Sequence, residues 1–326
     1  MTTARAQAQP FEIDPDDGPF DWGSYVRWLV GTHGTLSAVA IRLAQLRGFA
    51  EDAQSIERAL RRLRSRGQRD GGSWGQRCVR VFGVPKSITE RVRWMGHYHS
   101  RFTDLPRSVC LELLRPWLFP PVAESPARAW VQLGLASVAL RGRFVVEADE
   151  HLRQAEPVAR DAARAEALLV RAFIEHRRRP QRVPLILEEA ESEIADLPAG
   201  DDRACLWARL IDQRGYEFNV RQRDPAQALA LYESLPTVGP PFALVRRHNG
   251  IGWSSLQLGD RDAAVAHARR SVEQSGDAGS LRLRVMALNL LARALDNDEG
   301  QMARARALAI ASRLEDEALR VRLVRD

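Results

Sequence analysis

Apolar residues recur every three or four positions from Asp21 onward, and outside the loops no stretch alternates apolar with polar residues for more than four or five positions. The first spacing places apolar side chains on one face of a helix, whereas alternation would indicate a half-buried strand. A clear example is the run of Trp22, Tyr25, Val26 and Leu29. The sequence therefore predicts an all-α protein.

Capping residues divide the first hundred positions into short helices. The residues predicted to open these helices are Thr35, Gln54 or Ser55, Ser73 and Ser87. Serine and threonine cap a helix by accepting a backbone N–H, and Ser87 with Glu90 also forms a capping-box pattern. Gly48 and Gly67 are predicted to end the helices that follow the first two caps.

Four prolines lie within the eleven residues 116–126, where they forbid a continuous helix. We therefore predict a proline-rich linker over 116–126, which separates a basic helical domain over 21–115 from a second domain over 127–326. Residues 1–20 are polar with an acidic run, and they are predicted to form a disordered tail.

Charge is distributed unevenly along the chain. The segment 27–93 holds 14 basic and 5 acidic residues, a net charge of +9, whereas 121–326 holds 30 of each sign. A basic block beside a neutral block indicates that one domain meets a polyanion.

The segment 35–67 predicts a helix, a short break and a second helix, with Ala40 near the middle of the first. It resembles a helix-turn-helix DNA-binding unit, in which the second helix enters the major groove. The apolar residues of that second helix share one face, so its polar side chains fall on the other. The resemblance implies these nucleic-acid-binding residues: Ser55, Arg58, Arg61, Arg62, Arg64 and Arg66.

Two interpretations of this arginine-rich helix stay open. In the first, Arg58 and Arg62 read base edges. Arg61 and Arg64 then contact phosphates on either side. In the second, the arginines form a solvated face on which Glu57 pairs with Arg61 at i, i+4 spacing. The basic charge of the whole domain favours the first interpretation.

Beyond position 126 the chain is rich in alanine and leucine, and small residues recur with a period near 34 to 42 residues. In the best unit, 244–278, the residues that carry the pattern are Gly252, Gly259, Asp260 and Ala264. On these residues the region 127–315 resembles the tetratricopeptide repeat (TPR) family, although positions 255 and 271 are serine where tyrosine and alanine are usual. The resemblance implies a right-handed α-solenoid of helical hairpins; an irregular α-solenoid outside the family is the alternative.

A stack of such hairpins leaves a concave groove lined by the first helix of each pair. The partner-binding residues expected there are Gln213, Glu217, Arg221, Arg246, Asn249, Trp253 and Gln257. Amides, an indole and arginines together suit an extended peptide or a carboxylate. The alternative is that Trp253 packs between helices and the arginines are merely solvated.

The common nucleotide-binding and hydrolase motifs are absent, and the three cysteines have the spacing of neither a disulfide framework nor a zinc site. His97 and His99 would need a third ligand to bind a metal, and the nearest candidates in sequence are Asp104 and Cys110. A polar helix end explains the two histidines more simply. We therefore expect no catalytic residue, no metal and no cofactor.

These patterns predict a cytoplasmic DNA-binding transcriptional regulator, whose TPR-like domain senses a peptide or protein partner or mediates dimerisation. The sequence shows neither a signal peptide nor a membrane span. The expected partners are duplex DNA, a peptide or protein in the groove and a second copy of the chain. The alternative is a non-catalytic TPR-like adaptor, whose basic domain binds an acidic protein or RNA.

Overall fold

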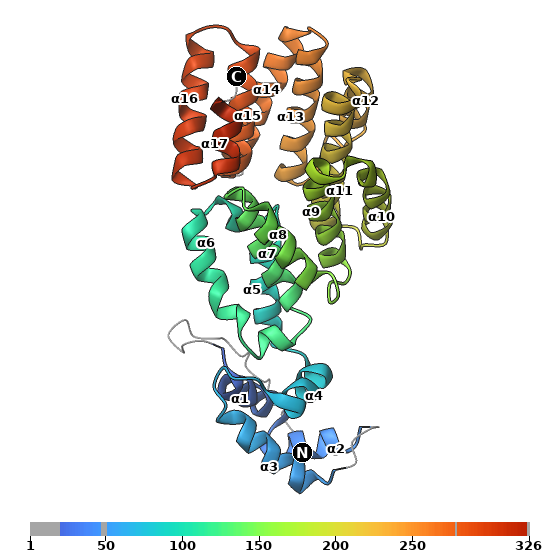
Figure 1. Ribbon diagram of the computed structural model, residues 1–326, viewed down its shortest axis with the longest axis vertical. Coiled ribbons are helices and arrows are strands. Elements are labelled where there is room, and N and C mark those ends of the chain that lie inside the picture. Colours follow the sequence, from blue (N-terminus) through green and yellow to red (C-terminus); the bar gives the residue numbers. More distant parts are fainter. Residues whose placement is uncertain (1–19, 47–50, 278, 325–326) are drawn as a thin grey trace, which may run out of the picture. The chain divides into compact units, whose positions relative to one another are not determined.

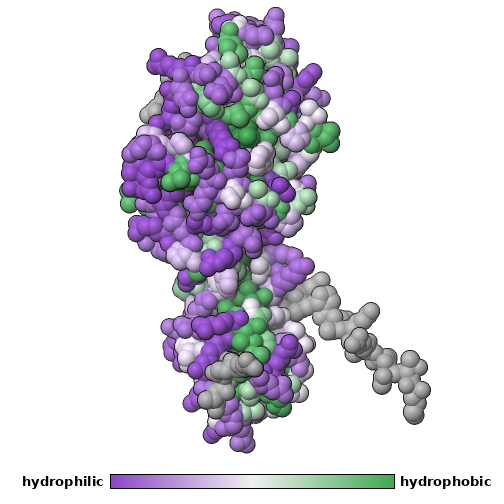
Figure 2. All heavy atoms as spheres, turned by 90° about the vertical axis from the view of Figure 1, so that its right-hand side faces the viewer, coloured by the Kyte–Doolittle hydropathy of each residue, from purple (hydrophilic) through white to green (hydrophobic). Residues whose placement is uncertain are grey.

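The computed structural model describes residues 20–46, 51–277 and 279–324 of the chain (Figure 1). The protein is all-helical, and the described residues contain no strand. The predicted tail over 1–20 falls outside the described residues except for Phe20, which is buried. None of the described helices is both long and apolar enough to cross a membrane. On the face shown in Figure 2, hydrophilic side chains predominate and apolar ones reach the surface in separate patches.

The chain forms two compact units. Unit 1 consists of residues 1–95 and 112–131, and unit 2 consists of residues 96–111 and 132–326. The segment 116–126, which the sequence predicts as a linker, lies within unit 1. It contains the 3-10 helices η2 (Arg115–Leu118) and η3 (Val122–Glu124), and its Val122 is buried. The backbone N–H of Gly71 donates to Glu124, so this segment is held against the helices of unit 1.

The helices of unit 1 are α1 (Trp22–His33), α2 (Leu36–Ala44), α3 (Ala53–Arg64), α4 (Gly72–Phe82) and α5 (Lys86–Gly96), of which α5 ends in unit 2. Their core uses the apolar faces that the sequence indicates. The buried hydrophobic residues of α1 to α3 are Trp22, Tyr25, Val26, Leu29, Val39, Ala40, Leu43, Ile56, Ala59, Leu60 and Leu63. The 3.6-residue periodicity thus identified most of this core, although the same periodicity also includes Leu46, which is 40% exposed.

The predicted helix starts are correct at one position and displaced at three. Thr35 caps α2 by accepting the N–H of Ala38. Asp52, rather than Gln54 or Ser55, caps α3, because its carboxylate accepts the N–H of Ser55 at 2.8 Å.

The other two displaced starts follow glycine and proline. The helix α4 begins at Gly72, ahead of Ser73, and α5 begins at Lys86 directly after Pro85, so Ser87 lies inside the helix. At the C-terminal ends, α2 stops at Ala44, and the predicted terminator Gly48 lies outside the described residues.

Trp22 is buried in the core of unit 1, and its ring leaves no room for a side chain at position 75 of the neighbouring helix. Its side chain is fully buried, and its indole N–H donates to the carbonyl oxygen of Arg69 at 2.8 Å. A Cβ atom at Gly75, in α4, would lie 2.7 Å from the Trp22 ring. Such a distance is shorter than van der Waals contact, so α4 can approach α1 only because position 75 has no side chain.

We expect Gly75→Ala to lower the free energy of unfolding by about 1–3 kcal/mol, since the clash outweighs the gain in helix propensity. Gly31→Ala is the matched control, because Gly31 lies inside α1, is exposed, and has no atom within 4 Å of an added Cβ. That substitution should stabilise the protein by about 0.5–1 kcal/mol. Urea denaturation followed by tryptophan fluorescence measures both, and equal effects of the two substitutions would contradict the packing described above.

Unit 2 contains the remaining helices, and the residues of α6 and α7 are divided between the two units. Their bounds are α6 (Arg107–Leu114), α7 (Arg128–Arg141), α8 (Val145–Ala155), α9 (Ala162–Arg178), α10 (Val183–Ala195), α11 (Asp201–Tyr216), α12 (Pro225–Glu233), α13 (Pro241–Gln257), α14 (Arg261–Asp277), α15 (Leu281–Ala294), α16 (Asp298–Arg313) and α17 (Glu317–Val324). Shorter elements are the 3-10 helices η1 (Arg101–Asp104) and η4 (Pro180–Arg182) and the π-helix η5 (Glu217–Gln222).

From α9 onward the helices pack as successive pairs. The members of each pair contact one another: α9 with α10, α11 with α12, α13 with α14, and α15 with α16 (Figure 1). The first helices of neighbouring pairs also contact one another, α9 with α11, α11 with α13, and α13 with α15. One face of these first helices therefore forms a continuous wall.

Small residues allow the close crossings in this stack. A Cβ atom at Gly215 or Gly250 would lie within 2.4 Å of the Tyr232 side chain, so the ring fits between α11 and α13 only over two glycines. The turn predicted between α13 and α14 is present. Gly259 has φ +86°, and the Asp260 side chain accepts the N–H of Ala263.

Two histidines meet where α13 packs on α14. The Nδ1 atoms of His248 and His267 lie 2.9 Å apart, so one ring donates to the other and at least one must be neutral. Burial, together with the neighbouring His267 and two arginines, lowers the pKa of His248 from 6.5 to about 4. Burial also lowers the pKa of His267.

Between about pH 6.5 and pH 4 the unfolded chain binds protons at these histidines that the folded chain does not. Their contribution to stability is thus complete above pH 6.5 and is lost as the pH falls toward 4. Because the pair keeps partial contact with water, we expect a loss of about 1–2 kcal/mol between about pH 7.5 and pH 5. A double variant, His248→Gln with His267→Gln, should lose measurably less over that range in urea denaturation, and an unchanged pH dependence would contradict the prediction.

Candidate functional site

The helix α3 presents two opposite faces. Its apolar residues are buried where α3 packs on α1 and α2. Of the predicted nucleic-acid-binding residues, Arg58, Arg61, Arg62, Arg64 and Arg66 are exposed, and Ser55 is half-buried. The structure therefore brings together the predicted arginines as one exposed surface, which we call the α3 arginine face. Arg66 lies two residues beyond the end of α3 and donates to the carbonyl oxygen of Asp70.

The arginines of this face differ in whether hydrogen bonds or ion pairs within the protein hold them. Arg61 pairs with Glu57 as the solvated-face interpretation predicts, and Glu57 also accepts from the Ser37 hydroxyl at 2.6 Å. The hydrogen bonds from Ser37 and Arg61 hold the pKa of Glu57 below its usual value. Arg58 donates to the Ser55 hydroxyl at 3.1 Å.

Arg62 and Arg64 are different. Within the described part of the chain, neither of their guanidinium groups has a hydrogen bond or an ion pair. An exposed arginine without an internal partner keeps all its donors for an external anion.

In unit 2, the wall formed by the first helices is hollowed by two adjoining cavities of about 180 Å³ and 530 Å³. The residues that line both are Asp212, Tyr216, Met286, Leu319 and Arg322. Five predicted groove residues line one or the other: Gln213 and Arg246 the smaller, and Asn249, Trp253 and Gln257 the larger. The α17 helix contributes the lining residues that follow Glu317.

Glu217 and Arg221 line neither cavity. They belong to η5, a π-helix in which the backbone turns more slowly than in an α-helix. The 3.6-residue spacing used to place them therefore fails at this point. Instead, Glu217 Oε1 lies 2.6 Å from His176 Nδ1, and Arg221 donates to the carbonyl oxygen of His176.

Arg246 occupies the predicted face but does not project freely from it. It is only 4% exposed, and its guanidinium donates to Asp212 Oδ2 at 2.6 Å and to the Tyr98 hydroxyl at 3.3 Å. Gln213 is likewise engaged, because its amide donates to the carbonyl oxygen of Leu169. These two side chains shape the cavity wall.

Tyr98 lines the smaller cavity, and the sequence did not reveal its place there. The guanidinium carbons of Arg209, Arg282 and Arg246 lie 4.4, 5.0 and 5.8 Å from the centre of its ring. Burial raises the pKa of the phenol, but the surrounding arginines outweigh burial and lower that pKa to about 8. No local signal marks this residue, because its partners come from helices more than a hundred positions away.

The smaller cavity is strongly basic. Its lining arginines are Arg141, Arg177, Arg209, Arg246, Arg282 and Arg322, and Asp212 is the single acidic residue among its lining residues. Further carboxylates stand behind the wall, where Glu166 pairs with Arg209, and Asp316 accepts from Arg282 at 2.9 Å. A basic, partly apolar cavity of this kind suits an anion with an attached apolar group.

Comparison with protein-family models gives no match for this chain, and comparison with curated proteins gives none either. The function is therefore inferred from the geometry of the α3 arginine face and of the cavities in unit 2.

Proposed function

We propose that this protein is a cytoplasmic DNA-binding transcriptional regulator, in which unit 1 binds duplex DNA and unit 2 senses an anionic partner. The observation that carries the proposal is the α3 arginine face, where five exposed arginines lie opposite a fully apolar buried face. In this proposal α2 and α3 act as a helix-turn-helix unit, and α3 enters the major groove.

Each arginine has a role that follows from its contacts. Arg62 has no internal partner within the described residues, so it reads a base edge, together with Arg58 and Ser55. Arg64, at the end of α3, contacts phosphate, as do Arg61 and Arg66. The net charge of +9 over 27–93 adds a sequence-independent attraction to DNA.

The preferred duplex is first selected from a random pool by the full-length protein. Fluorescence anisotropy over a salt series then compares wild type, Arg62→Ala and Arg64→Ala. We expect Arg62→Ala to cost about 1–3 kcal/mol on the selected duplex and to relax its preference there. Arg64→Ala should weaken binding to all duplexes alike and reduce the salt slope by about one.

Arg306→Ala is the matched control, because Arg306 is an exposed arginine on α16 in unit 2. It should leave DNA binding unchanged. Equal and negligible losses for all three variants, or selection of no preferred duplex, would contradict the DNA proposal.

A second candidate function is a non-catalytic adaptor that uses the same face to bind an acidic protein or RNA. It is favoured by the engagement of Arg61 with Glu57 and of Arg58 with Ser55, since side chains held within the helix are less available to base edges. Acidic peptides or single-stranded RNA competing better than the selected duplex in the same assay would support this function.

For unit 2 we propose TPR-like hairpins whose cavities bind a peptide through a carboxylate. The basic smaller cavity binds the carboxylate, and the larger cavity beside it takes the peptide chain along Asn249, Trp253 and Gln257. Occupancy then shifts a homodimer between arrangements that differ in their affinity for DNA.

A library of short peptides with free C-termini, each paired with its amidated form, tests this part. Isothermal titration calorimetry should show at least about tenfold preference for the free carboxylate, equivalent to 1.4 kcal/mol. Arg322→Ala should abolish that preference without changing the melting temperature, because Arg322 is an exposed residue that lines both cavities. Equal binding of the free and amidated peptides by wild type would contradict the proposal.

A further inference from the structure

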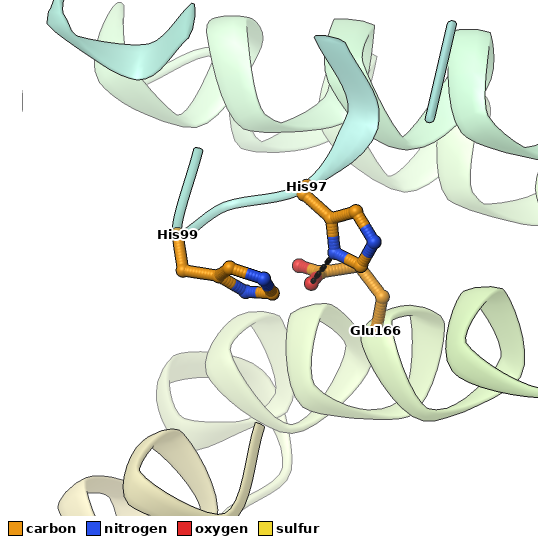
Figure 3. A group of neighbouring side chains, drawn as sticks. All are labelled: His97, His99 and Glu166. Atoms are coloured by element: carbon orange, nitrogen blue, oxygen red, sulfur yellow. Dashed lines mark ion pairs between the residues drawn. The ribbon is translucent and has the colours of Figure 1, made fainter. Parts of the chain in front are cut away.

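The loop that follows α5 brings two histidines onto a buried glutamate. Donor atoms of His97, His99 and Glu166 all lie within 4.8 Å of one another, and Figure 3 shows the Glu166 carboxylate between the two imidazole rings. His97 and His99 come from the loop, and Glu166 comes from α9. All three residues belong to unit 2. We propose that this cluster binds a divalent transition-metal cation, with Zn²⁺ as the expected ion.

Glu166 presents an unsatisfied oxygen to the cluster. The residue is 1% exposed, its Oε1 accepts from Arg209, and its Oε2 has no hydrogen-bond partner. That Oε2 atom is the one that faces His97, at 3.9 Å from Nδ1. A buried carboxylate oxygen without a hydrogen bond is costly, and a bound cation would satisfy it.

His99 is oriented as a metal ligand. Its Nε2 lies 3.1 Å from Asp202 Oδ1, so a hydrogen on Nε2 donates to that carboxylate. The lone pair is then on Nδ1, which is buried and accepts no hydrogen bond. A carboxylate that fixes the tautomer of a ligating histidine in this way is a common feature of zinc sites.

The ligand atoms of the cluster lie slightly farther apart than they would around a bound Zn²⁺ ion. His97 lies beside His99, with ring centroids 4.4 Å apart, and its Nε2 is 3.8 Å from Asp202 Oδ2. Tetrahedral Zn²⁺, with bonds of about 2.0–2.1 Å, places its ligand atoms about 3.3 Å apart. The distance from His97 to Glu166 would therefore shorten by about half an ångström. No pair of donor atoms would need to shorten by more than about 1.5 Å, which side-chain rotation can supply.

The third ligand differs from the ones that sequence order suggested. Asp104 is instead directed to the backbone N–H of Arg282, and the Cys110 thiol donates to the carbonyl oxygen of Phe102. Glu166 is the third candidate ligand instead, because α9 brings its carboxylate next to the loop.

A cation bound to this cluster would also hold part of the wall of the smaller, basic cavity in place. Tyr98 stands between the two histidines in sequence, and Arg209 contacts both Glu166 and the Tyr98 ring. The cation would hold the loop against α9 and thereby hold Tyr98 in the cavity wall. This role is structural, and it does not depend on the identity of the partner proposed for unit 2.

Untagged full-length protein is stripped with a chelator and titrated with Zn²⁺ by calorimetry, while Co²⁺ serves as a spectroscopic probe. We expect one Zn²⁺ per chain, a higher melting temperature with Zn²⁺, and visible d–d bands typical of nitrogen and oxygen ligands with Co²⁺. His99→Gln and Glu166→Gln should each weaken Zn²⁺ binding by at least about a hundredfold. Asp202→Asn should weaken it by about ten- to a hundredfold, because Asp202 orients His99 without being required as a ligand.

The double variant His248→Gln with His267→Gln is the matched control, because it removes the other histidine pair of unit 2 and should bind Zn²⁺ like wild type. Circular dichroism without metal confirms that each variant is folded. The metal-free alternative is a protonated His97 between Glu166 and Asp202. Absence of Zn²⁺ binding and of Co²⁺ bands in wild type, or equal affinity in wild type and His99→Gln, would overturn the proposal.

Discussion

A buried guanidinium must have a carboxylate or carbonyl partner, and this constraint organises unit 2. Arg141 is 2% exposed, and its donors reach the carbonyl oxygens of Leu105 and Leu314, which join distant parts of the unit. The fully buried Asp316 lies beside both Arg141 and Arg282. Removing one partner of such a pair leaves an uncompensated buried charge, which costs far more than the pair itself contributes. Buried carboxylates behind the wall of the basic cavity thus hold its lining arginines in place.

The same residue type serves two different purposes in the two units. In unit 1 the arginines of the α3 face point outward, and two of them have no partner within the described residues, so they are available to an external polyanion. In unit 2 the arginines around Tyr98 are fixed by ion pairs and by contacts with its ring, as the smaller anion of the proposal would require. Burial, rather than composition, separates these two uses.

Close helix crossings determine where the cavities of unit 2 lie. Tyr232 packs over Gly215 and Gly250, which draws α11 and α13 together and fixes the spacing of the wall. Two residues after Gly215 the chain enters the π-helix η5, in which Glu217 lies against His176 while Asn219 and Val220 line the larger cavity. The larger cavity is therefore lined by α-helical positions together with two residues of this π-helix.

The sequence by itself determined the all-helical class, the buried faces of α1 to α3, the exposed α3 arginine face and the turn at Gly259, because each depends on residues within a few positions of one another. It also placed five of the seven expected groove residues on the cavity walls. Only the tertiary structure decided that Arg246 is buried, that Tyr98 lies at the centre of the basic cavity, and that Glu166 joins His97 and His99. These features join residues from 34 to more than a hundred positions apart, and local periodicity carries no information about which distant side chains will share a buried space.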